Sequence, residues 1–206
     1  MKRVILSVLL ALCVAVVSGC ADLSIPLEYA FDSGTSFDEA ELYTVSVAVT
    51  DDRPYVLSGN KEPWFTGKYR TTFGIPHDAP SRGGVHLAHA VARDLAQDLR
   101  NAGFRVVQEN AERQILVSIM DYNFDCYMNC RVWHTLHVTI KDASGTTLKT
   151  KVADAEQKVS ARVAEYTMPR TMPEIYTQMI QGLIRNDAEA VSFLKRPSDE
   201  PAVILP

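Results

Sequence analysis

The chain has 206 residues, of which 47% are hydrophobic, 22% charged and 8% aromatic. This is the composition of an ordinary globular protein, and it excludes a disordered or collagen-like chain. The length suits one domain with short tails. The formal net charge is −4, from 25 acidic and 21 basic residues. A mildly acidic chain without a basic block is not expected to bind nucleic acid.

The first twenty residues have the pattern of a secretion signal. Lys2 and Arg3 supply a positive start, and an apolar run from Ile5 to Val17 follows. The run is shorter than the roughly 20 apolar residues that a transmembrane helix needs, and small residues end it. The sequence therefore predicts a segment that directs export.

The end of this segment, Val17-Ser18-Gly19-Cys20, resembles the lipobox of bacterial lipoproteins. The resemblance implies that residues 1–19 are removed and that Cys20 carries a covalent diacylglycerol and an N-acyl chain. A plain cleaved signal is the alternative. Ala21, not Asp, follows the cysteine, which by similarity to enterobacterial sorting implies the outer membrane, with the body facing the periplasm. No cofactor beyond these acyl chains is expected.

Residues 20–40 have weak periodicity and are predicted to be the tether between the lipid and a single domain at 41–196, with a tail at 197–206. Alternation over 41–50 indicates a half-buried strand. Residues 51–84 carry prolines, glycines and several aromatics but no helical periodicity. They are predicted to form a long loop, with a short edge strand over 69–73.

Residues 85–102 are the clearest helix of the sequence. Apolar residues recur at helical spacing on one side, and Arg93, Asp94, Gln97, Asp98 and Arg100 are expected to cover the other. Gly103 is the expected stop. A strand is predicted at 104–108, and a last helix at 172–194, with Pro173 in its first turn.

A long antiparallel hairpin is predicted from 114–124 and 131–141, followed by a strand at 148–157. Cys126 and Cys130 lie at its tip, and an even pair of thiols in an oxidising compartment favours a disulfide. A metal site is the alternative, with nearby candidate ligands Asp121, Asp125 and His134. The disulfide is preferred, and no metal is expected.

The predicted order is strand, long loop, helix, strand, three-stranded meander and helix. It indicates an α+β fold, with a mostly antiparallel sheet of four to five strands and two helices packed on one face. The pair of strands that the first helix connects is expected to be parallel. Topology of this kind does not define a function.

The chain resembles the YajG-type uncharacterised lipoproteins of Gram-negative bacteria over roughly residues 40–160. The resemblance rests on Cys20, the strand with Val45–Val49, the segment 52–59, and the short motifs Phe65-Thr66-Gly67 and Phe73-Gly74-Ile75-Pro76. The element order is also similar to that of envelope domains related to the N-terminal domain of TolB. Neither family implies a catalytic residue here.

Three patterns have residue types that could form a catalytic or metal site. Ser58-Gly59-Asn60-Lys61 has the Ser-x-x-Lys spacing of penicillin-binding enzymes, but its partner motifs are missing, so a chance match is favoured. His86 and His89 have ligand spacing on a helix, but no third ligand is indicated. His134 and His137 point to opposite faces of a strand and cannot share a metal. The chain is therefore predicted not to be an enzyme.

The candidate contact residues for a partner are aromatic, with one arginine. Tyr and Trp concentrate binding energy at interfaces, although a local core is an equal alternative for such a cluster. Arg53 belongs either to a binding edge or to a structural pair with a carboxylate. The predicted partner-binding set is Arg53, Tyr55, Trp64, Phe65, Tyr69 and Trp133.

These features predict a non-enzymatic outer-membrane lipoprotein that presents an interaction domain to an envelope protein partner during envelope assembly or maintenance. The alternative is an auxiliary lipoprotein of an envelope transport system that binds a lipid or a glycan. Contact with the membrane is expected through the lipid anchor.

Overall fold

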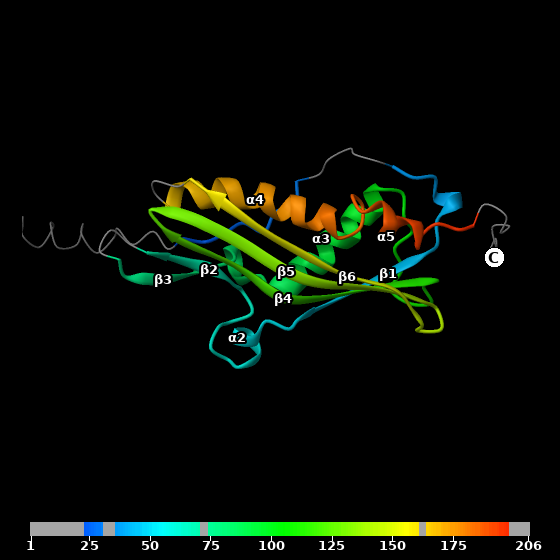
Figure 1. Ribbon diagram of the computed structural model, residues 1–206, viewed down its shortest axis with the longest axis horizontal. Coiled ribbons are helices and arrows are strands. Elements are labelled where there is room, and N and C mark those ends of the chain that lie inside the picture. The colour runs from blue at the N-terminus through cyan, green and yellow to red at the C-terminus, as the bar shows by residue number, and fades with distance from the viewer. Residues whose placement is uncertain (1–22, 31–35, 71–73, 161–163, 198–206) are drawn as a thin grey trace, which may run out of the picture.

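The computed structural model describes residues 23–30, 36–70, 74–160 and 164–197 (Figure 1). Helices α3, α4 and α5 lie on one face of a twisted sheet, and the short helix α2 lies on the other side (Figure 1). The strands are β1 (Val45–Asp51), β2 (Phe65–Arg70), β3 (Pro76–Pro80), β4 (Arg113–Tyr127), β5 (Asn129–Asp142) and β6 (Thr147–Val159). The helices are α2 (Pro54–Leu57), α3 (Leu87–Asn101), α4 (Ala164–Leu183) and α5 (Ala188–Ser192), with 3-10 turns η1 (Glu39–Glu41) and η2 (Arg82–Gly84).

Strand β4 organises the sheet, whose order is β3-β2-β4-β5-β6. One edge of β4 pairs antiparallel with β5. Its other edge pairs parallel with β1 over its first half and with β2 near its end. The expected α+β class is confirmed, as is the parallel pair connected through α3. The described residues form six strands, where four to five were expected.

The central hairpin follows its sequence pattern closely. Ile115, Val117 and Ile119 of β4 are buried on the helix-covered face, and Val132 and Leu136 of β5 share that face. A bulge between Ile119 and Asp121 shifts the register. As a result Asp121 lies on the open face of the sheet, opposite the one that α3 and α4 cover.

Helix α3 confirms the predicted helix and its end. Gly103 follows the C-cap Ala102 with φ 99°, a conformation that strains residues with a side chain. An added Cβ would also collide with the backbone oxygen of Phe37. The expectation that Asp94 and Asp98 cover a solvent face is wrong, because both are buried. The N-terminal segment and α4 lie over that side of α3.

The segment 23–30 is packed on the body and does not behave as a tether. Leu23, Ile25 and Leu27 are buried in the core. The Ile25 amide donates to the carbonyl of Pro80 at 2.9 Å, and Ala30 N donates to Thr177 Oγ1 at 2.9 Å. The packed body therefore includes the described segment that starts at Leu23, and it does not begin at the boundary at 41 that weak periodicity suggested.

Two other elements differ from expectation. The predicted loop 51–84 contains α2, β2, β3 and η2, with β3 and not β2 at the edge of the sheet; Phe73 lies outside the described residues. Residues 104–108 do not form a strand, because only Val106 bridges to Val45. The chain then turns toward β4 through Asn110, which has φ 55°.

The last helix begins earlier and ends earlier than predicted. α4 starts at Ala164 and contains Pro169 and Pro173, each of which removes one helical hydrogen bond. Buried Met168 and Met172 hold this half of the helix on the core. Asp187 then accepts a bond from Ala190 N at 3.0 Å and caps α5 as a separate helix.

Candidate functional site

The predicted partner-binding residues do not form one surface. Arg53, Phe65 and Tyr69 are buried, so their side chains have no surface to offer a partner, and the local-core interpretation holds for them. Arg53 pairs with Asp51 at 2.7 Å and donates to the carbonyl of Phe65 at 2.6 Å. A buried guanidinium needs such partners, and this one ties β1 to the start of β2.

Tyr55 and Trp133 are brought together by Asp121, which the sequence had suggested only as a candidate metal ligand. The Tyr55 hydroxyl donates to Asp121 Oδ1 at 2.9 Å, and Trp133 Nε1 donates to Asp121 Oδ2 at 2.8 Å. Burial raises the pKa of Tyr55, and the nearby Asp121 carboxylate adds to this while Arg53 opposes it. One carboxylate thus fixes two half-buried rings, from α2 and β5, on the open face of the sheet.

Trp64 belongs to a separate group of rings at the start of α3. Its ring lies 5.7 Å from that of His86, which stacks on His89 at 5.1 Å. His86 is the N-cap residue of α3, so only His89 lies within the helix. Among the described residues there is no group of three or more candidate metal ligands.

The Ser-x-x-Lys motif has no helical arrangement here. Ser58 is the C-cap of α2, whereas the serine of that motif opens a helix. The Lys61 ammonium contacts Asp78 at 2.5 Å. These two positions are therefore held by turn geometry and an ion pair between the α2 segment and β3.

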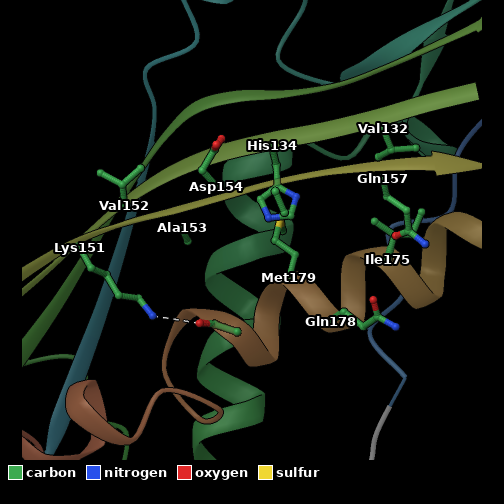
Figure 2. A pocket seen from close by; sticks show the side chains of 12 residues that line it. Val132, His134, Lys151, Val152, Ala153, Asp154, Gln157, Ile175, Gln178 and Met179 are labelled. Atoms are coloured by element: carbon green, nitrogen blue, oxygen red, sulfur yellow. Dashed lines mark hydrogen bonds between the residues drawn. The ribbon is translucent and has the colours of Figure 1, made fainter.

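A groove runs between β6 and α4 (Figure 2). Its volume is about 340 Å³, at the lower end of the range for small-molecule sites. His134 of β5 and Met179 of α4 point toward each other inside it (Figure 2). Burial lowers the pKa of His134, and Asp154 opposes this weakly. Lys151 closes one end by donating to the carbonyl of Gly182 at 3.0 Å.

The open face of the sheet carries a second depression. It has a volume of about 460 Å³ and lies over β1, β4, β5 and the start of β6, with Leu116, Ser118, His137 and Thr139 in its lining. The groove and this depression were missed from the sequence, because each forms only when elements far apart in the chain meet.

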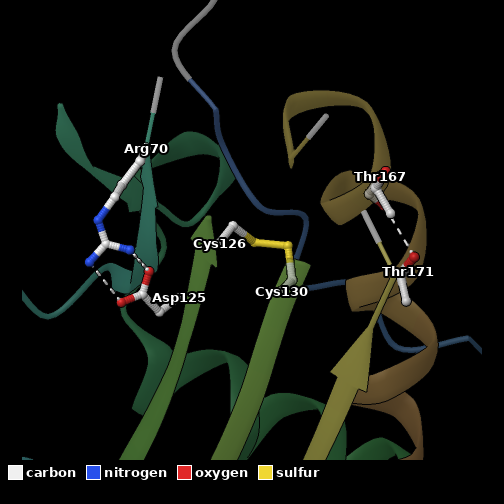
Figure 3. The surroundings of a disulfide bond; sticks show 6 residues. All are labelled: Arg70, Asp125, Cys126, Cys130, Thr167 and Thr171. Carbon is white, nitrogen blue, oxygen red and sulfur yellow. Dashed lines mark hydrogen bonds and ion pairs between the residues drawn. A yellow bond between two sulfur atoms is a disulfide. The ribbon is translucent and has the colours of Figure 1, made fainter. Parts of the chain in front are cut away.

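Cys126 and Cys130 form a disulfide at the tip of the β4–β5 hairpin (Figure 3). Asp125 and Arg70 form an ion pair beside it, at 2.6 Å. Asp121 and Asp125 lie on the open face whereas His134 faces the groove, so the candidate ligands of the metal alternative do not converge. The disulfide holds the two strand ends together where the chain reverses.

Comparison with known proteins shows the fold and no family. No family model matches the chain, and no curated protein matches it. A solved Xanthomonas campestris protein of the DUF330 family has a TM-score of 0.53 at 7% identity, covering 77% of this chain and 93% of that one. This likeness shows a shared fold.

Two bacterial lipoproteins are among the other solved structures. The uncharacterized lipoprotein B of Nitrosomonas europaea has a TM-score of 0.43 at 12% identity, covering 79% of this chain and 93% of that one. A minor lipoprotein of Acinetobacter baumannii has a TM-score of 0.42 at 9% identity, covering 75% and 98%. None of the described helices of this chain is long and apolar enough to cross a membrane.

Proposed function

We propose that the chain is a non-enzymatic outer-membrane lipoprotein of the YajG-like kind, acylated at Cys20, whose periplasmic body binds an envelope protein. The signal pattern that ends at Cys20 and the disulfide between Cys126 and Cys130 support export to an oxidising compartment. The lipoproteins among proteins of similar shape are consistent with this proposal.

One observation carries the choice of surface. Tyr55 and Trp133 lie on the face of the sheet opposite α3, α4 and α5, and Asp121 holds both rings in place. Half-buried aromatics that are already ordered lose little conformational entropy on binding. The surface that they form with the neighbouring depression is the place where we expect a protein partner to bind.

Photo-cross-linking in living cells tests this surface. A photoreactive residue is placed at Tyr55 or Trp133, with Glu174 as the control because it is exposed and lies on α4, on the helix-covered side of the sheet. The expected result is a discrete protein adduct at both test positions and none at position 174. The absence of a protein adduct at both test positions would contradict the proposed function.

The groove between β6 and α4 favours a second candidate, an auxiliary lipoprotein that binds a lipid or a glycan. Val132, Ile175 and Met179 give it an apolar floor, and polar groups such as Gln178 stand at its rim. This combination is typical of small-molecule sites. On this proposal, His134 would present a neutral imidazole to the ligand, because burial lowers its pKa.

Mass spectrometry of gently purified protein tests the second candidate. Gly182 lines the groove, and a Cβ added there meets nothing within 4 Å, so Gly182→Leu places an apolar side chain in the groove wall and should narrow the groove. Glu174→Leu, at an exposed position of α4 outside the groove, is the matched control. A bound lipid or glycan that is lost only in Gly182→Leu supports this function, and consistently empty protein contradicts it.

A further inference from the structure

Exposed hydrophobic side chains are concentrated at one end of the sheet, which we call the hairpin end. Six large hydrophobic side chains are exposed among the described residues, and four lie here: Ile75 at 56%, Tyr127 at 55%, Met128 at 79% and Tyr166 at 73% exposed. Soluble surfaces seldom gather apolar side chains without a binding role. This clustering therefore indicates that something covers the hairpin end.

The strand register places these four residues at the same end. Tyr69 of β2 pairs with Cys126, and Val159 of β6 pairs with Cys130, so both strands finish beside the hairpin tip. Ile75 directly precedes β3, whose Pro76 pairs with the last residue of β2. The first turns of α4, which carry Tyr166, also lie beside the disulfide (Figure 3).

The tip is held in shape by several contacts. The disulfide joins Cys126 to Cys130, and Met128 turns the chain with φ 65°. The guanidinium of Arg70 lies 5.6 Å from the centre of the Tyr127 ring. Tyr127 and Met128 are thus presented to the outside by an ordered turn.

The N-terminus of the described chain leads toward this end. Ile25 bridges in parallel to Ser81, directly after β3, and β3 runs away from the hairpin end. Leu23 therefore lies on the hairpin side of Ile25. Cys20 precedes Leu23 by three residues, a length of chain that reaches at most about 11 Å. Acyl chains on Cys20 would enter a bilayer close to the hairpin end.

We propose that the hairpin end is a membrane-contacting surface. Ile75, Tyr127, Met128 and Tyr166 enter the interfacial layer of the same bilayer leaflet that holds the acyl chains of Cys20. This inference rests on the acylation of Cys20 in the proposed function. Tyrosine suits the boundary between headgroups and acyl chains because it is apolar with a polar tip.

The contact is apolar in character. Among the described residues, two arginines near the tip are each paired with a carboxylate, Arg70 with Asp125 and Arg131 with Glu156, and Lys158 also lies near Glu156. A cation that is already paired with a carboxylate gives little net attraction to anionic lipid. Salt screens electrostatic attraction, so it has little effect on a contact made by apolar side chains. Binding of the hairpin end is therefore expected to be insensitive to salt.

The arrangement also sets the height of the proposed partner surface. Trp133 follows Met128 by five residues along β5, which corresponds to about 17 Å at the rise of a β-strand. With the hairpin end on the membrane and the sheet upright, Tyr55 and Trp133 would face the periplasm above the headgroups. A partner could then reach them without entering the bilayer.

Photo-cross-linking of the mature, acylated full chain tests the proposal in vesicles of phosphatidylethanolamine with a minority of phosphatidylglycerol. Photoreactive residues are placed at Met128 or Tyr166. Leu57 and Val152 are matched controls, since they are 69% and 58% exposed but lie away from the hairpin end. We expect a severalfold excess of lipid adducts at positions 128 and 166, unchanged when salt is raised.

Equal lipid adducts at all four positions on acylated protein would overturn the membrane contact and leave the proposed function intact. Adducts that vanish at high salt would overturn its apolar character. Intact mass of the mature chain reports acylation, with Cys20→Ser as the control. A chain without the acyl mass would contradict the lipoprotein function and, with it, this inference.

Discussion

Asp98 and Asp121 make the same kind of contact on opposite sides of the sheet. Asp98 of α3 accepts from the Tyr29 hydroxyl and pairs at 3.4 Å with Arg185 in the turn after α4, and it is fully buried. Asp121 of β4 accepts from Tyr55 and Trp133 and stays partly exposed. The two carboxylates differ in burial, and this difference determines how much each contact contributes to the stability of the fold.

The inner carboxylate joins three segments that are remote in sequence: the N-terminal segment, α3 and the turn after α4. A buried charge is strongly destabilising once its partner is lost, so this contact specifies how the segments pack. The outer carboxylate is partly solvated, so losing it costs less, and its effect is confined to the positions of two rings. The comparison predicts that substituting Asp98 mainly lowers the stability of the fold, whereas substituting Asp121 mainly weakens binding of a partner.

Removing each carboxylate is the strongest test. Asp98→Ala leaves Arg185 buried without its main counter-charge and should lower the free energy of unfolding by about 3–5 kcal/mol. Asp121→Ala should lower it by only about 1 kcal/mol. Urea unfolding of the two variants measures both values, and equal losses would break the comparison.

Deleting one hydroxyl on each side is a finer test. Tyr29→Phe removes a hydrogen bond to a buried carboxylate and should cost about 1.5–3 kcal/mol, the range for bonds to charged groups. Tyr55→Phe, whose bond to Asp121 is partly solvated, should cost about 1 kcal/mol or less. The same unfolding assay applies, and a larger cost for Tyr55→Phe would contradict the assignment of Asp98 to the interior.

The Tyr29 contact also predicts a response to alkali. Burial and the hydrogen bond to Asp98 raise the pKa of Tyr29 from 10.0 to about 12. Between those values the unfolded chain loses the proton while the folded chain keeps it, so stability falls as pH rises through this range. Unfolding measured against pH should show that slope in the native protein, and a shallower one in Tyr29→Phe.

The hairpin and α3 could be predicted from the sequence because their patterns are local. Alternation in β5 and the apolar stripe of α3 report directly which face of each element is buried, and Trp133 lies on the face opposite the core. Asp94 and Asp98 were misplaced, because the periodicity of one helix does not reveal that two other segments cover its polar side. The packing of residues 23–30 was missed for the same reason.

The Asp121 cluster was beyond prediction for a different reason. A β-bulge after Ile119 shifts the register of β4, and a shift of one residue moves a side chain to the other face. Tyr55 and Trp133 were both candidates from the sequence. Their common partner became visible only when α2 was placed against β4.

The smallest predicted effect on stability is that of His134. Its side chain is on the helix-covered face of the sheet, but it lines the groove and is not part of the closed core. Burial lowers its pKa below the reference value of 6.5. The unfolded chain therefore binds the proton first as pH falls, and stability declines from about pH 6.5 down to the folded pKa. Each tenfold change in proton affinity corresponds to about 1.4 kcal/mol.

His134→Gln should flatten this acid slope, with His137→Gln on the open face as the matched control. Urea unfolding between about pH 5 and 7 measures it, across the range in which histidine titrates. A slope that survives in His134→Gln would assign the acid response to another group. An anionic ligand in the groove would stabilise the protonated imidazole and reduce the slope in the native protein. Comparing the slope of the protein as purified with that of ligand-free protein therefore also tests whether the groove binds an anion.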